Sequence, residues 1–342
     1  MLNGNDHKNF TACNDAEAEA LLQRVLLETG ETLSGTGLCV LLGGSYGRGD
    51  GGVRLDRNNG ILYNDLDFFV FARKESDNAA AILKEVAEKY ENELKIDVDF
   101  SRIMTIKDIK NNASRLMMQE LKRGYHLVCG TDLIAEYLPE IPANALPFSE
   151  ACRLLLNRGM GLLFAGEKIA ANSADSDFIL RNIYKAILGA GDAMLIAKGE
   201  YRWRISERLE VIGKSGLPEQ WKEFYREAVN FKHSPHSEKK PDMNVFWHDV
   251  RDFFQYAMVQ CAEVSEVCDL PEGIYRCCRK RGETSIKNYI KYCIKTRSLP
   301  LKGFKNHTIP AVAAVMCEVY SALNTMSEKT DEKLYRLWQI FN

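Results

Sequence analysis

The pattern of hydrophobic and polar residues changes near residue 106, and the change predicts two structural regions. Before this point, short apolar runs bounded by glycine or polar residues are typical of buried strands. The predicted strands are 37–44, 64–73 and 94–104. Helical periods predict helices at 78–93 and at 15–29, with Gly30 ending the latter. This order predicts a small mixed β-sheet backed by helices.

After residue 106 nearly every apolar pattern is helical. Residues 107–124 have the helical period, and the run 125–130 predicts one edge strand. Prolines 139, 142 and 147 predict a linker. The helical segments beyond it are 149–166, 178–198, 217–231, 243–265, 283–296 and 309–341. We therefore predict an α+β protein with a mixed domain at 1–140 and an all-helical domain at 148–342.

Net charge, cysteine spacing and apolar runs limit the kind of protein and the kind of partner that we expect. The 342-residue chain has a net charge of −2 and therefore no overall basic field, which argues against a long nucleic acid as partner. Its ten cysteines follow no disulfide-like spacing, its first residues lack the apolar core of a signal peptide, and no apolar run is long enough to span a membrane. We therefore expect a soluble cytoplasmic protein with free thiols and no membrane partner.

Two smaller groups of residues have plain interpretations. The adjacent pair Cys277-Cys278 is not a CxxC motif, so the sequence does not favour a zinc site. His233 and His236 fall in a polar, proline-containing stretch without a nearby cysteine. We expect them to be solvated loop residues.

A glycine-rich turn follows the first predicted strand. Gly43 and Gly44 allow unusual backbone angles and a close approach by another group, and Ser45 offers a hydroxyl. A helix beginning near Ser45 would present free amides to a phosphate, with Arg48 one turn further on. The alternative is a tight turn in which Ser45 caps a helix. No Gly-Lys-Ser/Thr follows, so this is not the common phosphate loop.

Two pairs of aspartates occupy the other predicted strands. Asp65 and Asp67 share one face of a strand because side chains alternate, and Asp97 and Asp99 repeat the pattern later. Carboxylates this close repel one another unless a cation lies between them, and Mg²⁺ prefers oxygen ligands. Each pair alone also fits a strand end that faces water. Together, downstream of the glycine turn, they indicate a two-metal phosphoryl-transfer site.

The ordered pattern Gly44-Ser45-x-x-Arg48-Gly49, Asp65-x-Asp67 and a later strand aspartate resembles the DNA polymerase beta-type nucleotidyltransferase superfamily. The resemblance covers roughly residues 40–103, with a longer loop before Asp65 than the family usually has. It implies that the glycine-serine turn holds a nucleoside triphosphate such as ATP. It further implies that Asp65 and Asp67 bind two Mg²⁺ or Mn²⁺ ions.

By the same resemblance, a third carboxylate binds the catalytic metal and helps to deprotonate the acceptor hydroxyl. Asp97 and Asp99 share a face, so both fit this role. The flanking residues Val98 and Phe100 favour Asp99.

The helical region offers less specific candidates. Related enzymes bind the triphosphate with a lysine of the helical domain. Lys185, which shares one helix face with Arg181, is the candidate for this contact. The alternative is that both residues belong to an ordinary solvated basic face. Asn157-Arg158 interrupts an apolar helix and is either a buried polar anchor for the domain interface or an acceptor contact. The group 201–204, Tyr-Arg-Trp-Arg, is compatible with nucleobase stacking or with surface packing.

These observations predict a Mg²⁺-dependent nucleotidyltransferase. The acceptor hydroxyl would belong to a small molecule, a protein side chain or an RNA end, and the near-neutral charge favours a small or compact acceptor over long nucleic acid. The alternative is a nucleotide-binding regulatory or antitoxin-like protein of the same fold that acts through a protein partner. A helical scaffold with an incidental motif is the third class.

Overall fold

The structure is a computed structural model that describes residues 9–54, 61–74, 79–235, 242–298, 308–325 and 331–341. His236 and the tip of the polar loop, 55–60, lie outside these residues. The chain divides into two compact units. Unit 1 comprises Met1–Ile141 and Asn230–His236, and unit 2 comprises Pro142–Val229 and Ser237–Asn342.

Unit 1 contains a five-stranded mixed sheet. Its strands are β1 (Cys39–Leu42), β2 (Leu66–Ala72), β3 (Val98–Phe100), β4 (Met104–Thr105) and β5 (His126–Cys129). The order is β3-β2-β1-β5, and β4 also pairs with β2. Strand β1 is antiparallel to β2 and β5, whereas β3 and β4 run parallel to β2. The predictions of a mixed sheet and of an edge strand at 125–130 are confirmed.

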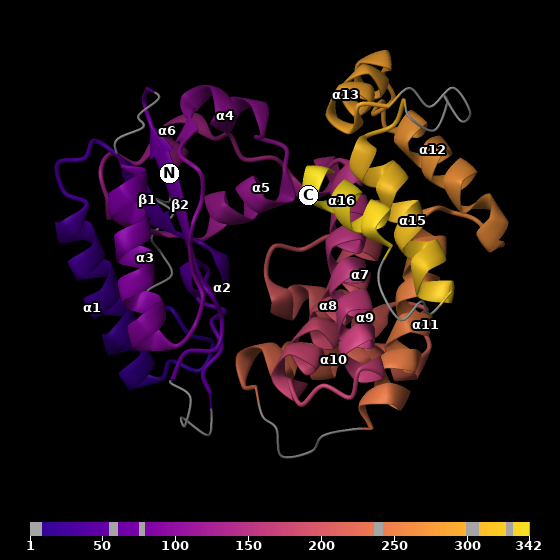
Figure 1. Ribbon diagram of the computed structural model, residues 1–342, viewed down its shortest axis with the longest axis horizontal. Helices are drawn as coiled ribbons and strands as arrows, with labels where there is room; N and C mark the ends of the chain where they lie inside the picture. The colour runs from indigo at the N-terminus through magenta and orange to yellow at the C-terminus, as the bar shows by residue number, and fades with distance from the viewer. Residues whose placement is uncertain are drawn as a thin grey trace. The chain divides into compact units, whose positions relative to one another are not determined.

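Helices cover both faces of this sheet (Figure 1). They are α1 (Ala16–Thr32), α2 (Gly44–Gly47), α3 (Ala80–Leu94), α4 (Ile106–Asn111), α5 (Leu116–Arg123) and α6 (Leu133–Tyr137). Buried side chains of α1 and α3 pack with Val40, Leu42, Leu66 and Phe68 of the sheet. The buried side chains of α4, α5 and α6 pack with strand residues that point to the other face of the sheet, among them Phe71.

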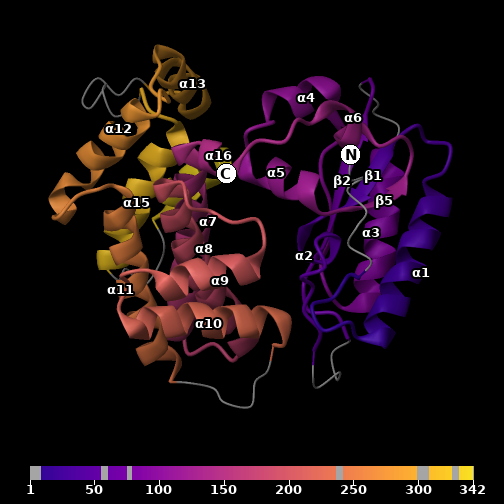
Figure 2. The ribbon, with the colours of Figure 1, turned by 180° about the vertical axis from the view of Figure 1, so that it is seen from behind.

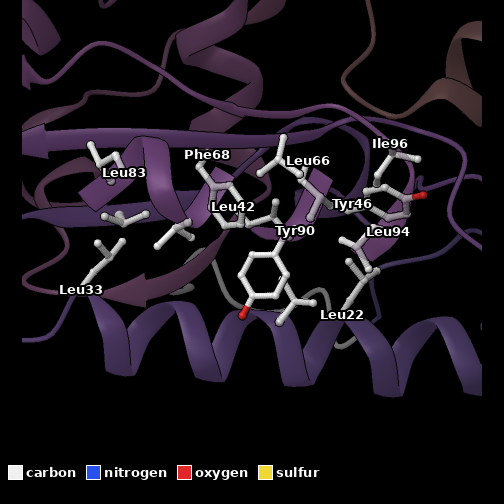
Figure 3. Close-up of a cluster of buried hydrophobic side chains, with 14 of the residues drawn as sticks. Leu22, Leu33, Leu42, Tyr46, Leu66, Phe68, Leu83, Tyr90, Leu94 and Ile96 are labelled. Atoms are coloured by element: carbon white, nitrogen blue, oxygen red, sulfur yellow. The ribbon is translucent and has the colours of Figure 1, made fainter. Parts of the chain in front are cut away.

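The cluster under α1 and α3 holds the sheet in place. Figure 3 shows its members from α1, α3 and the strands gathered in one layer, together with Tyr46 of α2. The sheet positions in this cluster alternate with outward positions, so burying Leu66 and Phe68 turns Asp67 to the other face. The apolar pattern of β2 therefore determines the face on which its aspartates lie.

Three local predictions were wrong, each for a physical reason. Helix α1 does not end at Gly30 but continues to Thr32; a Cβ at Gly30 would lie 2.7 Å from the Val128 carbonyl oxygen, so this glycine allows α1 to approach β5 closely. The segment 107–124 forms two helices, because Asn112 ends α4 with a side-chain bond to the Asp108 carbonyl.

His233 is the third correction. It is the last residue of helix α10 (Glu219–His233) and is half-buried, not a solvated loop histidine. Its carbonyl oxygen accepts a hydrogen bond from the Val53 amide at 3.2 Å. Burial, and then the charge of Lys232, lower the pKa of His233.

The described part of unit 2 contains only helices, so the α+β class is confirmed (Figures 1 and 2). Besides most of α10, these are α7 (Phe148–Ala170), α8 (Ser176–Lys198), α9 (Ile205–Lys214), α11 (Met243–Cys261), α12 (Leu270–Lys280), α13 (Ile286–Thr296), α15 (Ala311–Thr325) and α16 (Glu332–Phe341), with short 3₁₀ turns at Ala143–Ala145 and Val267–Asp269. The sequence pattern missed α9 and α12. In the part of the chain that the structure describes, no helix is both long and apolar enough to cross a membrane.

Candidate active site

The Gly43–Ser45 turn lies against Asp67. The Gly43 amide donates a hydrogen bond of 2.8 Å to the Asp67 carbonyl oxygen. Gly44 has a φ of +62°, and a Cβ placed there would overlap the Asp67 carboxylate. Glycine is therefore required at this position both by its backbone angle and by the close approach of Asp67. The structure brings the glycine turn and the first acidic pair together.

The helix after this turn differs from the expectation. Helix α2 is a single turn of four residues, and its N-cap is Gly43, without a side-chain cap. Among the described residues, the Ser45 hydroxyl has no hydrogen-bond partner, so Ser45 does not cap the helix. Because a macrodipole needs several aligned turns, the predicted dipole contribution to an anion site is small here. Backbone amides and the Ser45 hydroxyl remain as donors.

Asp67 and Asp99 are register partners on neighbouring strands. In the parallel pair β2–β3, Asp67 lies opposite Asp99, with Leu66 opposite Val98 and Phe68 opposite Phe100. The buried neighbours fix the alternation, and the rings of Phe68 and Phe100 stack at 4.6 Å. The two aspartates therefore lie on the same face of the sheet.

Asp65 and Asp97 precede these strands. The Leu66 amide donates a hydrogen bond to the Asp97 carbonyl oxygen at 3.0 Å, which places Asp97 beside the start of β2. Within the described residues, neither Asp97 nor Asp99 has a side-chain hydrogen bond or ion pair. The predicted acidic residues thus converge at the amino-terminal ends of β2 and β3.

The surroundings of Asp99 disfavour its charged form. Burial among neighbouring atoms, and then the charges of Asp65 and Asp97, raise the pKa of Asp99. Glu91 adds a smaller contribution in the same direction. Because the Asp99 side chain is also open to solvent, water screens these repulsions. A cation at this position would relieve them.

The donor set fits a hard divalent ion in its chemistry. Carboxylate oxygens are the ligands that Mg²⁺ prefers, and after burial the charges of Asp65 and Asp97 contribute to the raised pKa of Asp99. No three His, Cys, Asp or Glu side chains of the described ranges lie close enough together to form a ready metal cluster. Asp65, Asp67 and Asp99 would therefore have to draw together around a bound ion.

Tyr46 is a site neighbour that the sequence interpretation missed. Its side chain is fully buried directly after Ser45. Its hydroxyl donates to the Gly52 carbonyl oxygen at 2.9 Å and accepts from the Tyr63 and Asn64 amides at 2.9 and 3.2 Å. The sequence carries no sign of this bonding, because the partners are in the polar loop.

The base of that loop is a short hairpin. Val53 forms an antiparallel bridge with Leu62, and the Arg54 amide donates to the Ile61 carbonyl oxygen at 2.8 Å. The Asn64 side chain accepts from the Gly52 amide at 2.7 Å. The two described ends of the segment before Asp65 therefore pair with each other.

The last turn of α10 supplies a second neighbour that was missed. Lys232 Nζ lies 3.8 Å from Asp50 Oδ2, and the Asp50 amide donates to the Ser45 carbonyl oxygen at 2.9 Å. The Phe231 ring meets Tyr63 edge to face at 5.7 Å. Unit 1 thus gains a cation near the Ser45 turn from a segment far along the chain.

Arg48 points toward α5. Its Nη1 atom lies 3.4 Å from Glu120 Oε2, and its side chain packs over Gly124, where a Cβ would be 2.7 Å from Arg48 Cγ. Arg48 therefore anchors the turn to α5. Its predicted contact with a nucleotide stays a prediction.

The candidates of unit 2 mostly have internal partners. Lys185 lies on α8 one turn after Arg181, which forms a 3.5 Å ion pair with Asp177. Asn157 Oδ1 accepts from Trp338 Nε1 at 3.1 Å. The role of Lys185 toward a triphosphate and that of Arg158 toward an acceptor stay predictions.

The aromatic group at 201–204 is largely structural. Tyr201 is fully buried, and its hydroxyl accepts from Arg208 Nη1 at 3.0 Å. The same nitrogen donates to the carbonyl oxygens of Arg202 and Trp203. Tyr201 is therefore not an open stacking surface. Cys277 and Cys278 are free, buried thiols on α12.

Comparison with known proteins finds no matching family model, no matching curated protein and no matching solved structure.

Proposed function

We propose that the chain is a Mg²⁺-dependent nucleotidyltransferase that moves a nucleoside monophosphate from a nucleoside triphosphate to an acceptor hydroxyl and releases pyrophosphate. One observation carries the proposal: the Asp67 carboxylate lies against Gly44 of the turn, with Asp99 opposite it across β2 and β3. Carboxylates next to a glycine turn are the combination that a metal-bound triphosphate needs.

Each residue has a role in this reaction. Asp65, Asp67 and Asp99 would hold the metal ions, and the amides and hydroxyl at Ser45 would bind phosphate oxygens. Bound Mg²⁺ would neutralise phosphate charge and lower the pKa of the acceptor hydroxyl. The new bond joins the acceptor oxygen to the α-phosphorus, and the bond to pyrophosphate breaks. Asp99 is suited to take the acceptor proton, because it lies opposite Asp67 on the same face of the sheet.

The register supports Asp99 over Asp97 as the third carboxylate. Asp99 lies directly opposite Asp67, whereas Asp97 lies before β3. The nucleotidyltransferase fold is part of the proposal, and a small mixed sheet covered by helices on both faces is compatible with it.

Nucleotide binding and transfer can be measured separately on the full chain. Calorimetry with each of four nucleoside triphosphates, with and without Mg²⁺, should show binding that requires the metal and is lost in Asp67→Asn. A screen with α-labelled triphosphates should then show label on one acceptor among aminoglycosides, RNA ends and proteins. Wild-type protein that binds no triphosphate in Mg²⁺ or Mn²⁺ would refute the proposal.

A further inference from the structure

The ring of Tyr46 has a closely defined position. It is fully buried in the cluster that joins the sheet to α1 and α3 (Figure 3). A Cβ at Gly51 would overlap the ring, so the chain passes directly over it. Because the neighbouring backbone leaves no free space, the hydroxyl cannot move without moving the loop.

The Tyr46 hydroxyl is saturated with hydrogen bonds. A phenol offers one donor and two acceptor positions, and all three are used, by the Gly52 carbonyl oxygen and by the Tyr63 and Asn64 amides. Burial raises the pKa of Tyr46, so the proton that donates to Gly52 stays in place at neutral pH. This hydroxyl therefore adds to the backbone pairing at the loop base, where the Tyr63 amide also donates to the Gly52 carbonyl oxygen at 3.3 Å.

These three partners lie at the two ends of one loop. Gly52 is where the chain leaves the Ser45 turn, and Tyr63 and Asn64 are where it returns to Asp65. One side chain thus ties the start of the loop to its end. Ser45 directly precedes Tyr46, and Asp65 directly follows Asn64, so the tie also sets the separation of the turn and the first acidic residue.

We propose that Tyr46 is a positioning residue of the site, which holds Asp65 and Asp67 in register with the Ser45 turn through its hydroxyl. The inference rests on the proposed function, because it concerns the binding of a metal-bound triphosphate. Misplacing a site by even 1 Å costs up to about 100-fold in rate. Loss of the hydroxyl should therefore weaken nucleotide binding in addition to lowering the melting temperature.

Tyr90 provides a matched control in the same cluster. It is also a buried tyrosine, and its hydroxyl bonds to Glu28 and Lys89 at 3.0 and 3.2 Å. These partners belong to α1 and α3, so Tyr90→Phe removes a hydroxyl from the same cluster without removing a bond to the loop base. Tyr46→Phe and Tyr90→Phe should both lower the melting temperature.

The two variants should differ in other measurements. Only Tyr46→Phe should weaken Mg²⁺-dependent ATP binding, and only this variant should lower the rate of transfer by about tenfold or more, which is within the range that misplacement allows. Only Tyr46→Phe should accelerate hydrogen exchange of the Asn64 amide, which loses its acceptor, whereas the Tyr63 amide keeps the Gly52 carbonyl oxygen. Equal ATP affinity in both variants would overturn the inference.

Failure of the proposed function would look different. If wild-type protein binds no nucleotide, the proposed function fails, but exchange at Asn64 still tests the tie, and an unchanged rate in Tyr46→Phe would refute it. If Tyr46→Phe does not fold, Asn64→Ala removes the acceptor of the Gly52 amide at the same loop base. Unchanged ATP affinity in Asn64→Ala would then count against the inference.

Discussion

The carboxylate of Asp67 occupies the space that a side chain on Gly44 would fill. This contact joins the glycine turn to the acidic strand, and the Gly43 amide repeats the connection through the Asp67 carbonyl. The turn and the aspartate therefore form one structural unit. A substitution in the turn should therefore displace Asp67, and a substitution of Asp67 should alter the turn.

Gly44→Ala tests this contact. The added methyl group must displace the Asp67 carboxylate, and a left-handed backbone costs a non-glycine residue about 1–2 kcal/mol in addition. Gly35→Ala is the matched control, because Gly35 has a φ of +79° and nothing within 4 Å of its Cβ. Thermal unfolding should show a larger loss for Gly44→Ala, and only this variant should lose Mg²⁺-dependent ATP binding. Equal losses in the two variants would contradict the proposed contact.

Asp97→Asn and Asp99→Asn separate the two candidates for the third carboxylate. Asp99 lies opposite Asp67 and should be needed for transfer, so Asp99→Asn should lower kcat by at least about 100-fold, the scale of a general base. Asp97→Asn should keep transfer within about tenfold of wild type, because removing a nearby charge changes only the pKa of Asp99. The rate of single-turnover transfer measures both. The reverse order would assign Asp97 as the third carboxylate.

The raised pKa of Asp99 predicts a pH dependence of stability. A carboxyl group with a higher pKa in the folded state binds more protons when folded, so its contribution to stability falls as pH rises from about 3.9, the ordinary aspartate value, through the folded pKa. At pH 7 the charged Asp99 is therefore unfavourable. Asp99→Asn should raise the melting temperature at pH 7, and the gain should shrink as pH falls toward 4.

Magnesium provides the second half of this test. If Asp99 helps to hold the ion, Mg²⁺ should raise the melting temperature of wild-type protein at pH 7 and should raise that of Asp99→Asn less. Sodium chloride at equal ionic strength controls for screening. An identical response of the two proteins to Mg²⁺ would exclude Asp99 as a ligand.

The sequence pattern was sufficient where the relevant information is local. Alternation in β2 and β3 predicted that Asp65 and Asp67 share a face and that Asp97 and Asp99 do the same. Burial of Leu66 and Val98 shows that Asp67 and Asp99 lie on the other face, whereas Asp65 and Asp97 precede the strands and their part of the prediction stays a prediction. The close approach expected at the glycine turn is also confirmed, because Gly44 leaves room for Asp67.

Local patterns could not reveal contacts between distant segments. A glycine after a helical pattern normally marks the end of the helix, yet Gly30 lies within α1 and allows this helix to approach Val128. The last turn of α10 reaches unit 1 only through tertiary packing, so nothing near His233 or Lys232 in sequence indicates Asp50 or Val53 as neighbours. The hydroxyl of Tyr46 bonds to a loop that the sequence identified only as polar and longer than the family usually has.

The buried pair of Arg208 and Asp192 offers a last prediction, in unit 2. Arg208 Nε lies 3.0 Å from Asp192 Oδ1, both side chains are largely buried, and Tyr225 donates to Asp192 at 2.7 Å. Arg208→Met would leave the Asp192 charge without its cation and should cost about 3–5 kcal/mol, measured as the free energy of unfolding in urea. The double variant Arg208→Met, Asp192→Asn removes both charges and should recover much of this loss, since an unpaired buried charge costs more than an absent pair. A double variant no more stable than Arg208→Met would show instead that the bonds of Arg208 to Tyr201 and to the carbonyl oxygens of Arg202 and Trp203 dominate.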